Sequence, residues 1–324
     1  MRQSIHHIEV SLLSVILIVG GFAYGQTGSS ELGGLAGAPF RLGFGARGIG
    51  MGNAMTAVPY GNVSSYYNPA LVPYQPTPTV LLSYGSLTMD RRLNFLSYTQ
   101  HLNPDAGLSV GIINAGVSNI DGRDNDGQQT ETYSTSENEF FFTFGLIPSD
   151  RLTFGVTAKV LYYSLYTDVK STTFGADLGA LYSLSDELRL AFVVQDLLSK
   201  YKWDTSKLYG ESGSSYVNDF PTRKRLGLSY HSHDLRMIAA GEVEWIGSAT
   251  YARLGVELQL FSGLEIRGGI DQISFAREVT AKPSFGFSVQ TEVASWSPRI
   301  DYAYVIEPYV STGMHYLTLS ISFQ

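Results

Sequence analysis

From residue 79 to the C-terminus, apolar and polar residues alternate with a period of two, which is the pattern of β-strands rather than of helices. The last segment shows this clearly, because threonine and serine separate Leu317, Leu319, Ile321 and Phe323. Fourteen segments share the pattern, near residues 79–89, 92–102, 106–118, 138–147, 151–168, 172–184, 187–197, 222–232, 235–246, 249–261, 264–276, 282–294, 298–307 and 313–323. The alternation predicts an all-β protein.

Two all-β architectures give each strand one apolar and one polar face. A soluble β-sandwich buries the apolar face, whereas a transmembrane barrel turns it to lipid and keeps polar side chains in the lumen. The predicted strands are about 10–14 residues long, against about 5–6 in soluble proteins. The chain also ends on a strand with Phe323 as its penultimate residue. Because single-chain bacterial barrels have an even number of strands, we predict a 14-stranded antiparallel transmembrane β-barrel.

The connections between the predicted strands alternate in length. Every even-numbered connection is short, as at 103–105, 185–186 and 262–263, and the two longest, 119–137 and 198–221, are both odd-numbered. Outer-membrane barrels have short periplasmic turns and longer outer loops. The alternation therefore supports the strand count independently of the hydrophobic pattern.

The first 25 residues are typical of a secretory signal peptide. Arg2 gives a positive start, an apolar run follows at Val10–Gly21, and Ala23-Tyr24-Gly25 matches a small-residue cleavage site. The alternative is a single membrane anchor, which needs about 20 apolar residues. We expect cleavage before Gln26, export from the cytoplasm, and a place in the outer membrane of a Gram-negative cell.

Composition narrows the function. Charged residues make up 16% of the chain, against about 25% in a typical soluble domain. The net charge of −7 argues against a nucleic-acid binder, which needs an excess of lysine and arginine. The absence of cysteine excludes disulfides, thiolate metal sites and cysteine nucleophiles. We expect no cofactor and a monomeric barrel in lipid.

Residues 26–78 do not fit the barrel pattern, because they are rich in glycine and alanine and lack clear period-two runs. A barrel of this size encloses a bore that is either a channel or is plugged. Small residues allow a close approach to the lumen wall. We therefore expect three regions: a signal peptide at 1–25, an N-terminal plug at 26–78 and the barrel at 79–324.

A specific resemblance lies within the predicted plug. Residues 43–71 read GFGARGIGMGNAMTAVPYGNVSSYYNPAL. This stretch resembles the signature of the PorV/PorQ family of outer-membrane proteins, which is related to the FadL-type transporters. The plug signature residues that we single out are Gly45, Arg47, Gly50, Met51, Gly52, Asn68 and Pro69. One departure is Pro59-Tyr60-Gly61, which stands where the family has an acidic pair.

The resemblance implies a 14-stranded barrel with an inner N-terminal segment, and it offers two functions. The first is a component of type IX-like protein secretion, whose partners would be secreted proteins with C-terminal signal domains. The alternative is a FadL-like channel for fatty acids or other hydrophobic compounds, whose partners would be small molecules. We take secretion as the main interpretation of the sequence and uptake as the alternative.

Charged residues are expected in the lumen of the barrel. Every second side chain of a strand faces the same side, and we call this rule strand parity. It places eight charged residues in the lumen: Glu242, Glu244, Arg253, Glu257, Glu265, Arg267, Asp271 and Asp301. Arg47 is the one charged residue of the plug signature, and a buried arginine needs a bidentate acidic partner. We hypothesise that Arg47 pins the plug to a lumen carboxylate, with a position at the periplasmic rim as the alternative.

The long connection 198–221 is a candidate surface for partners. Its aromatic residues are Tyr201, Trp203, Tyr209, Tyr216 and Phe220. Exposed aromatic side chains favour contacts with other proteins. The alternative is that the loops pack on one another over the barrel mouth.

Other motifs are weak. The glycine spacing at 43–48 matches a dinucleotide fingerprint but lacks the later acidic residue. In the connection 119–137, Asp124 and Asp126 are spaced as calcium ligands, but the rest of the EF-hand pattern fails. His231 and His233 lie at a turn, where a polar turn is the simpler interpretation than a metal site. No nucleophile elbow occurs, so we expect neither a metal site nor an enzyme.

Overall fold

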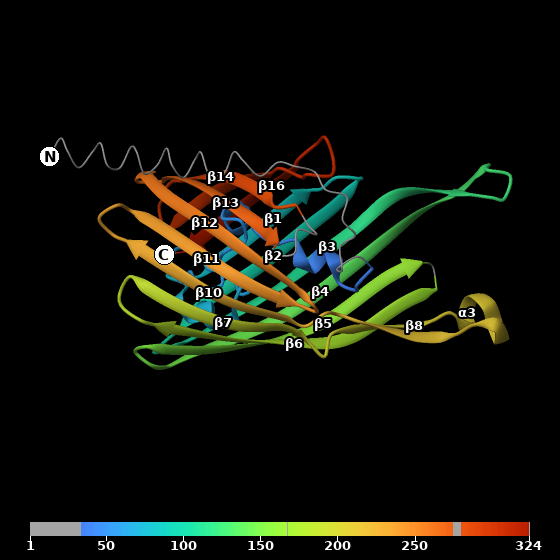
Figure 1. Ribbon diagram of the computed structural model, residues 1–324, viewed down its shortest axis with the longest axis horizontal. Helices are drawn as coiled ribbons and strands as arrows, with labels where there is room; N and C mark the ends of the chain where they lie inside the picture. The colour runs from blue at the N-terminus through green and yellow to red at the C-terminus, as the bar shows by residue number, and fades with distance from the viewer. Residues whose placement is uncertain (1–33, 167, 275–279, 324) are drawn as a thin grey trace.

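The computed structural model describes residues 34–166, 168–274 and 280–323. Fourteen strands close into one barrel in the order β1-β16-β15-β14-β13-β12-β11-β10-β7-β6-β5-β4-β3-β2, as Figure 1 shows. The barrel strands are β1 (Thr79–Ser86), β2 (Arg91–Leu102), β3 (Ala106–Arg123), β4 (Gln129–Ser149), β5 (Leu152–Tyr166), β6 (Val169–Ser183), β7 (Leu188–Leu197), β10 (Arg223–Ser232), β11 (Met237–Ile246), β12 (Ala249–Phe261), β13 (Leu264–Ser274), β14 (Lys282–Gln290), β15 (Trp296–Val305) and β16 (Met314–Phe323). Every neighbouring pair is antiparallel, so the predicted architecture is confirmed.

The two faces of the wall differ as a membrane barrel requires. Inward positions carry serine, threonine and paired charges, and outward positions carry large apolar side chains. Phe142, Phe154, Phe192, Phe285 and Leu317 are examples of exposed apolar residues on five different strands. A soluble sandwich would reverse this arrangement, because water would meet the polar face. The apolar exterior therefore identifies a barrel that spans a membrane.

The two ends of the barrel are unlike. Short turns lie at one end, and two long hairpins project from the other, at the right of Figure 1. We call these the short-turn end and the hairpin end. The predicted alternation of short and long connections is confirmed by this arrangement.

The first projecting hairpin corrects the sequence analysis, because residues 119–137 are not a loop. β3 and β4 continue as a paired ribbon to Arg123 and Gln129, with a bulge between Val117 and Ile120. Asn119 has a φ of 60° at this bulge. The ribbon lies beyond the apolar part of the barrel wall, so it needs no apolar face. Its strands therefore lack the alternation of apolar and polar residues from which the other strands were predicted.

The second hairpin replaces most of the predicted loop 198–221. It consists of β8 (Lys200–Asp204) and β9 (Ser215–Asp219), joined through α3 (Ser206–Tyr209) and η3 (Gly210–Ser212). β8 lies against the first residues of β6. The Lys202 amide donates to the Ser171 hydroxyl at 2.8 Å, and the Thr173 hydroxyl donates to the Lys200 carbonyl.

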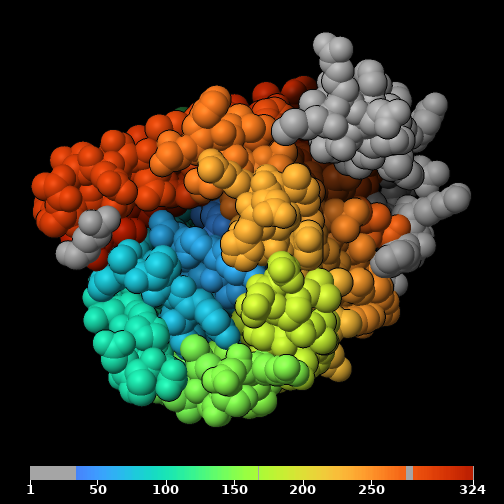
Figure 2. Space-filling view, turned by 90° about the vertical axis from the view of Figure 1, so that its left-hand side faces the viewer, coloured from blue at the N-terminus to red at the C-terminus, as the bar shows by residue number. Residues whose placement is uncertain are grey.

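The described N-terminal residues, 34–78, lie inside the barrel and form what we call the plug. Seen from the short-turn end, their blue atoms fill the centre of the ring of strands in Figure 2. The plug contains η1 (Ala38–Arg41), α2 (Ala46–Gly50) and η2 (Pro69–Tyr74), and β1 begins at Thr79. The predicted signal peptide lies outside the described residues. Among the residues described, no helix has the length and apolar character needed to cross a membrane.

Candidate functional site

The plug contacts two different walls of the barrel. α2 packs against β13 to β16, and η2 packs against β2 to β6. The amide of Ala46, at the start of α2, donates to the Thr318 hydroxyl on β16 at 2.8 Å. Both helical segments are too short to be stable alone, so the wall contacts fix their position.

Arg47 makes the ion pair that the sequence predicted. Its Nε and Nη2 atoms donate to the two carboxylate oxygens of Glu257 on β12 at 2.9 and 2.7 Å. Its Nη1 atom donates to the carbonyls of Tyr60 and Asn62 at 2.6 and 3.0 Å. Burial disfavours the charged guanidinium, but Glu257 outweighs burial, and the pKa of Arg47 lies above its ordinary value. The pair joins plug and barrel at a site closed to water.

The glycines of the plug signature allow a close approach to the wall. Gly52 has a φ of 60°, and a Cβ on it would lie 2.5 Å from the Ile270 amide nitrogen on β13. A Cβ on Gly50 would lie 2.9 Å from the Arg267 side chain. Gly45 has a φ of 76° at the N-cap of α2, and Met51, at the C-cap of the same helix, is fully buried.

Asn68 and Pro69 begin η2. The Asn68 Oδ1 atom accepts from the Ala70 amide at 2.8 Å, and its Nδ2 atom donates to the Thr56 carbonyl at 2.9 Å. Asn68 therefore caps the helix and ties it to the preceding loop, which accounts for an asparagine before a proline at this position.

The inward face of β10 to β15 is a dense network of paired charges, which we call the charged wall. Arg253 contacts Glu242, Glu244 and Asp271, and Arg267 contacts Glu257, Glu265 and Asp301. All eight lumen charges predicted from strand parity belong to this wall. Asp271 also accepts from Asn53 of the plug at 2.8 Å, and Glu242 accepts from Thr56.

Three arginines of the charged wall were missed by the sequence analysis. Arg223 and Arg225 on β10 contact Glu244, and Arg299 on β15 contacts Glu265 and Asp301. The same parity rule would have found them, because Arg223 and Arg225 share a face with Ser229, and Arg299 shares one with Asp301. With Arg47, six arginines and six carboxylates form two connected groups: Arg223, Arg225, Arg253, Glu242, Glu244 and Asp271 in one, and Arg47, Arg267, Arg299, Glu257, Glu265 and Asp301 in the other.

A second buried charge cluster lies across the lumen. Lys159 on β5 contacts Asp177 at 2.9 Å, Asp196 at 3.1 Å and Glu139 at 3.3 Å. Asp196 follows Gln195 on β7, and both side chains are buried, because a bulge and a φ of 62° at Asp196 turn both inward.

Four glycines on neighbouring strands form a row that receives η2. Gly107 pairs with Gly145, Gly145 with Gly155, and Gly155 with Gly179. A Cβ on Gly155 would lie 2.2 Å from the carbonyl carbon of Pro69. We call these four residues the glycine row; they form a groove in which the η2 backbone lies directly on the wall.

Aromatic rings gather in the half of the lumen toward the hairpin end. Phe44 of the plug packs against Tyr66 and against Phe95 on β2, with ring centroids 4.6 and 5.5 Å apart. Phe141 on β4 stacks on Phe95 at 5.9 Å. These rings belong to one buried hydrophobic cluster, together with Tyr163, Tyr201, Trp203 and Phe220. We call these eight rings the aromatic cluster.

The β8–β9 hairpin supplies the cover of this cluster. Tyr201 packs against Tyr163 at 5.1 Å and against Phe220 at 5.0 Å, and its hydroxyl donates to Glu137 at 3.1 Å. The expectation of five exposed aromatic residues is therefore wrong for Tyr201, Trp203 and Phe220, which are buried. Tyr209 and Tyr216 are exposed. For the three buried residues, the alternative prediction of packing over the barrel mouth agrees with the structure.

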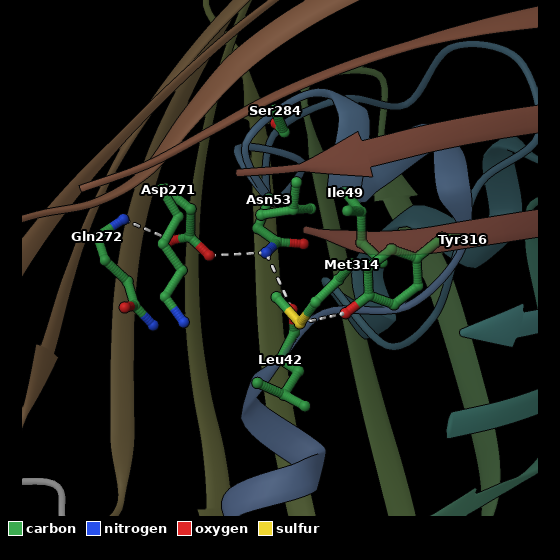
Figure 3. Close-up of a pocket in the computed structure, with 10 residues that line it drawn as sticks. Leu42, Ile49, Asn53, Asp271, Gln272, Ser284, Met314 and Tyr316 are labelled. Carbon is green, nitrogen blue, oxygen red and sulfur yellow. Dashed lines mark hydrogen bonds between the residues drawn. The ribbon is translucent and has the colours of Figure 1, made fainter. Parts of the chain in front are cut away.

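A small cavity lies between the plug, the charged wall and β16 (Figure 3). Asn53 points toward Asp271 on one side and donates to the Leu42 carbonyl at 3.2 Å. On the other side are apolar side chains of Ile49, Met314 and Tyr316. The cavity thus has one polar and one apolar side.

The residues of the weak metal-binding motifs make other contacts. Among the described residues, no group of three or more His, Asp or Glu side chains could hold a metal ion. Asp124 uses its carboxylate within the hairpin turn, where it accepts from the amides of Asp126 and Gln128. His231 packs between Tyr60 and His233, with ring centroids 4.2 and 4.3 Å away.

Several solved structures are similar to this one over most of its length. The toluene transporter TodX of Pseudomonas putida is 14% identical, with a TM-score of 0.61 over 86% of this chain and 96% of that chain. The toluene transporter TbuX of Ralstonia pickettii is 12% identical, with a TM-score of 0.58 over 88% and 100%. A FadL homologue of Pseudomonas aeruginosa is 10% identical, with a TM-score of 0.56 over 85% and 97%.

No known family profile matches the chain, and no curated sequence matches it. The structural likeness spans nearly the whole length of both partners, at identities that establish the fold alone. The chain therefore has the fold of the FadL/TodX-like 14-stranded barrels.

Proposed function

We propose that this protein is an outer-membrane channel that admits small, uncharged hydrophobic compounds. The observation that carries the proposal is the aromatic cluster, in which eight rings gather within the buried apolar core of the lumen. Ligand sites for hydrophobic compounds are concave and lined mainly by apolar and aromatic side chains. The likeness to solved barrels described as toluene transporters supports the same choice.

Entry from the hairpin end requires movement of the β8–β9 hairpin. Tyr201, Trp203 and Phe220 fill the space over Tyr163 and hold the cluster closed. Along the barrel wall, the base of the hairpin is held to β6 through Ser171 and Thr173. A small number of polar contacts therefore controls access to a large apolar surface.

The charges of the lumen favour uncharged cargo over fatty-acid anions. Each arginine of the charged wall contacts at least one carboxylate, and Lys159 contacts three. Arg41 donates to the carbonyls of Ala36 and Leu35. A carboxylate ligand would have to compete with these partners or be buried without one, which is costly.

The secretion role is the second candidate. It rests on the resemblance of residues 43–71 to the PorV/PorQ signature, and the structural roles of these residues in plug packing fit either function. Tyr209 and Tyr216 are the exposed aromatic residues that remain as partner contacts. We rank secretion below uptake because the buried aromatic cluster has a direct use in uptake.

Tryptophan fluorescence tests the proposed binding region. The chain has 3 tryptophans: Trp203 in the cluster is 5% exposed, and Trp245 and Trp296 on the outer wall are 40% and 55% exposed. A variant with Trp245→Phe and Trp296→Phe reports on Trp203 alone. We expect saturable quenching by bromobenzene and competition by toluene. The matched control carries Trp203→Phe and Trp296→Phe, leaving Trp245, and should show only linear quenching by partition into detergent.

A result in which Trp203 is quenched no more than Trp245, with no competition by toluene, would contradict the proposal. Saturable binding of laurate with the same affinity as toluene would contradict the preference for uncharged cargo while keeping the channel.

A further inference from the structure

The hairpin cover places a phenol group inside the aromatic cluster. The side chain of Tyr201, which is p-cresol attached through its methyl carbon, is 2% exposed. Its ring centroid lies 5.1 Å from that of Tyr163, 5.0 Å from that of Phe220 and 5.5 Å from that of Trp203. Its hydroxyl donates to a carboxylate oxygen of Glu137 at 3.1 Å. The region proposed to hold cargo therefore already encloses an uncharged aromatic ring with one hydrogen-bond donor.

The acceptors for this donor belong to the barrel wall. Glu137 and Glu139 occupy neighbouring inward positions of β4, and we call them the acidic pair. Glu137 stands opposite Tyr163 on β5, and Glu139 stands opposite Leu161. Both of these partners belong to the buried hydrophobic cluster that contains the aromatic rings. Because Tyr201 belongs to the hairpin, opening of the cover removes the donor and leaves the acidic pair in the wall.

Glu139 has acceptor capacity that the protein does not use. Its Oε1 atom lies 3.3 Å from the Lys159 ammonium, the longest of the three ion pairs of that lysine. Among the described residues, its Oε2 atom has no hydrogen-bond partner, although Glu139 is only 2% exposed. Leaving a buried polar atom without a partner is unfavourable. A ligand that brings a hydrogen-bond donor to the acidic pair would relieve this cost.

The charges around the acidic pair favour an uncharged donor. Lys159 faces three carboxylates, and Arg41, whose charge acts on Glu137, donates its hydrogen bonds to backbone carbonyls. A phenolate or carboxylate ligand would therefore meet an excess of negative charge. A phenol is uncharged below about pH 10, and a hydrogen bond from its hydroxyl to an ionised acceptor is stronger than one between neutral groups.

We propose that the preferred cargo is a neutral phenol, which takes the place of the Tyr201 side chain and donates its hydroxyl to the acidic pair. The ring would lie against Tyr163, and the hydroxyl would bind where Tyr201 now donates, with the unused oxygen of Glu139 as the neighbouring acceptor. Tyr201 is then an internal competitor of the cargo. The inference rests on the proposed channel, and it narrows the cargo from hydrophobic compounds in general to aromatic compounds with a hydroxyl group.

Displacement of bromobenzene from the Trp245→Phe and Trp296→Phe variant tests the inference, with toluene, p-cresol and 4-methylanisole as competitors. All three carry a methyl-substituted ring, and only p-cresol can donate a hydrogen bond. We expect p-cresol to compete about tenfold more strongly than toluene, and 4-methylanisole no more strongly than toluene. Adding Glu137→Gln and Glu139→Gln together should reduce the advantage of p-cresol to about twofold and leave competition by toluene unchanged.

Tyr201→Phe gives a second test in the opposite direction. It keeps the ring of the cover and removes the hydroxyl that competes with the cargo. We expect the affinity for p-cresol to rise about fivefold and the affinity for toluene to stay the same. A cover that had merely become loose would change the affinities for both compounds alike, so an equal change for both would count against the inference.

Glu131→Gln is the matched control for the acidic pair, because it removes the same charge from the exposed outer end of β4. It should leave the affinities for all three competitors unchanged, and heat-dependent migration on a detergent gel shows whether each variant is folded. Equal competition by toluene and p-cresol, or a full p-cresol advantage in the Glu137→Gln and Glu139→Gln variant, would overturn the inference and leave the channel standing. Failure of all three compounds to displace bromobenzene would overturn the channel and the inference with it.

Discussion

At the scale of single residues, the contact between Arg47 and Glu257 holds the plug in the barrel. Both groups are buried, and the two hydrogen bonds are bidentate. Removing Arg47 takes two hydrogen bonds from buried Glu257, which keeps Arg267 as a partner at 3.0 Å, and weakening a buried pair in this way is strongly destabilising. We expect Arg47→Ala to lower the free energy of unfolding by about 3 kcal/mol, measured by denaturant unfolding in detergent, and to expose the plug to protease.

An exposed pair gives the control for this prediction. Arg123 lies 3.9 Å from Asp121 in the β3–β4 hairpin, with both side chains more than half exposed. Arg123→Ala should change the stability by less than about 1 kcal/mol. If Arg47→Ala behaves like Arg123→Ala in both stability and protease resistance, the ion pair does not hold the plug.

Tyr201 offers a residue-scale test of the hairpin cover. Its hydroxyl donates to Glu137, which belongs to the wall of the barrel. Tyr201→Phe keeps the ring and removes the bond, at a cost of about 1 kcal/mol. We expect faster exchange of bound hydrocarbon at Trp203 in stopped-flow fluorescence, with little change in the unfolding of the barrel. Exchange at the wild-type rate would show that this bond does not retain the cover.

At the scale of elements, the glycine row decides how η2 is seated. In Gly155→Ala, the new methyl group would meet backbone atoms of Pro69, which cannot move without the whole segment. We expect the plug to be displaced and to become sensitive to protease, while the barrel still closes. Gly268→Ala on β13 is the matched control, because a Cβ there would lie 3.9 Å from its nearest neighbour. Equal protease resistance of the two variants would contradict the assigned role of the row.

Strand parity predicted the charged wall, and on β4 to β6 it also places Glu139, Lys159 and Asp177 in the lumen, but it could not place Asp196 beside them. The eight lumen charges were identified because β11 to β15 alternate regularly where these residues lie. On β7, parity would place only one of Gln195 and Asp196 in the lumen, whereas the bulge turns both inward. A bulge is a local backbone event with no apolar signature, so sequence periodicity misses it.

The hairpins show the other limit of periodicity. The pattern detects strands through the apolar face that lipid requires. β9 is exposed along its whole length, and the outer ends of β3 and β4 are mostly polar on both faces. Their strand pairing comes from backbone hydrogen bonds and turn geometry, which a hydrophobic pattern does not encode. Contacts that depend on tertiary packing, such as Tyr201 with Glu137, are equally invisible to it.

At the scale of the whole molecule, the plug and the hairpin cover enclose the aromatic cluster inside a closed barrel. The short-turn end is filled by the plug, and the hairpin end is covered by Tyr201, Trp203 and Phe220. Under the proposed function, transport through the aromatic cluster would require motion of the hairpin relative to β6. The fold class, strand count and plug were all predictable from the sequence, whereas this arrangement of the cover was not.

The account is tested most directly by measuring toluene uptake through a variant in which a reversible disulfide links β6 to β8. A Cβ on Gly175 would lie 3.2 Å from the Cβ of Ser199, and the wild-type chain has no cysteine. Disulfide Cβ atoms lie about 3.5–4.5 Å apart, so Gly175→Cys with Ser199→Cys should form one disulfide once the two strands separate by a few tenths of an ångström. We would measure uptake of labelled toluene by cells that lack the native protein and carry this variant, before and after reduction.

The account predicts that wild-type protein restores uptake, that the oxidised variant does not, and that reduction recovers it. Each single-cysteine variant should transport whether or not it is reduced. Toluene uptake that is the same with and without the protein would contradict the central claim of a hydrophobic-compound channel.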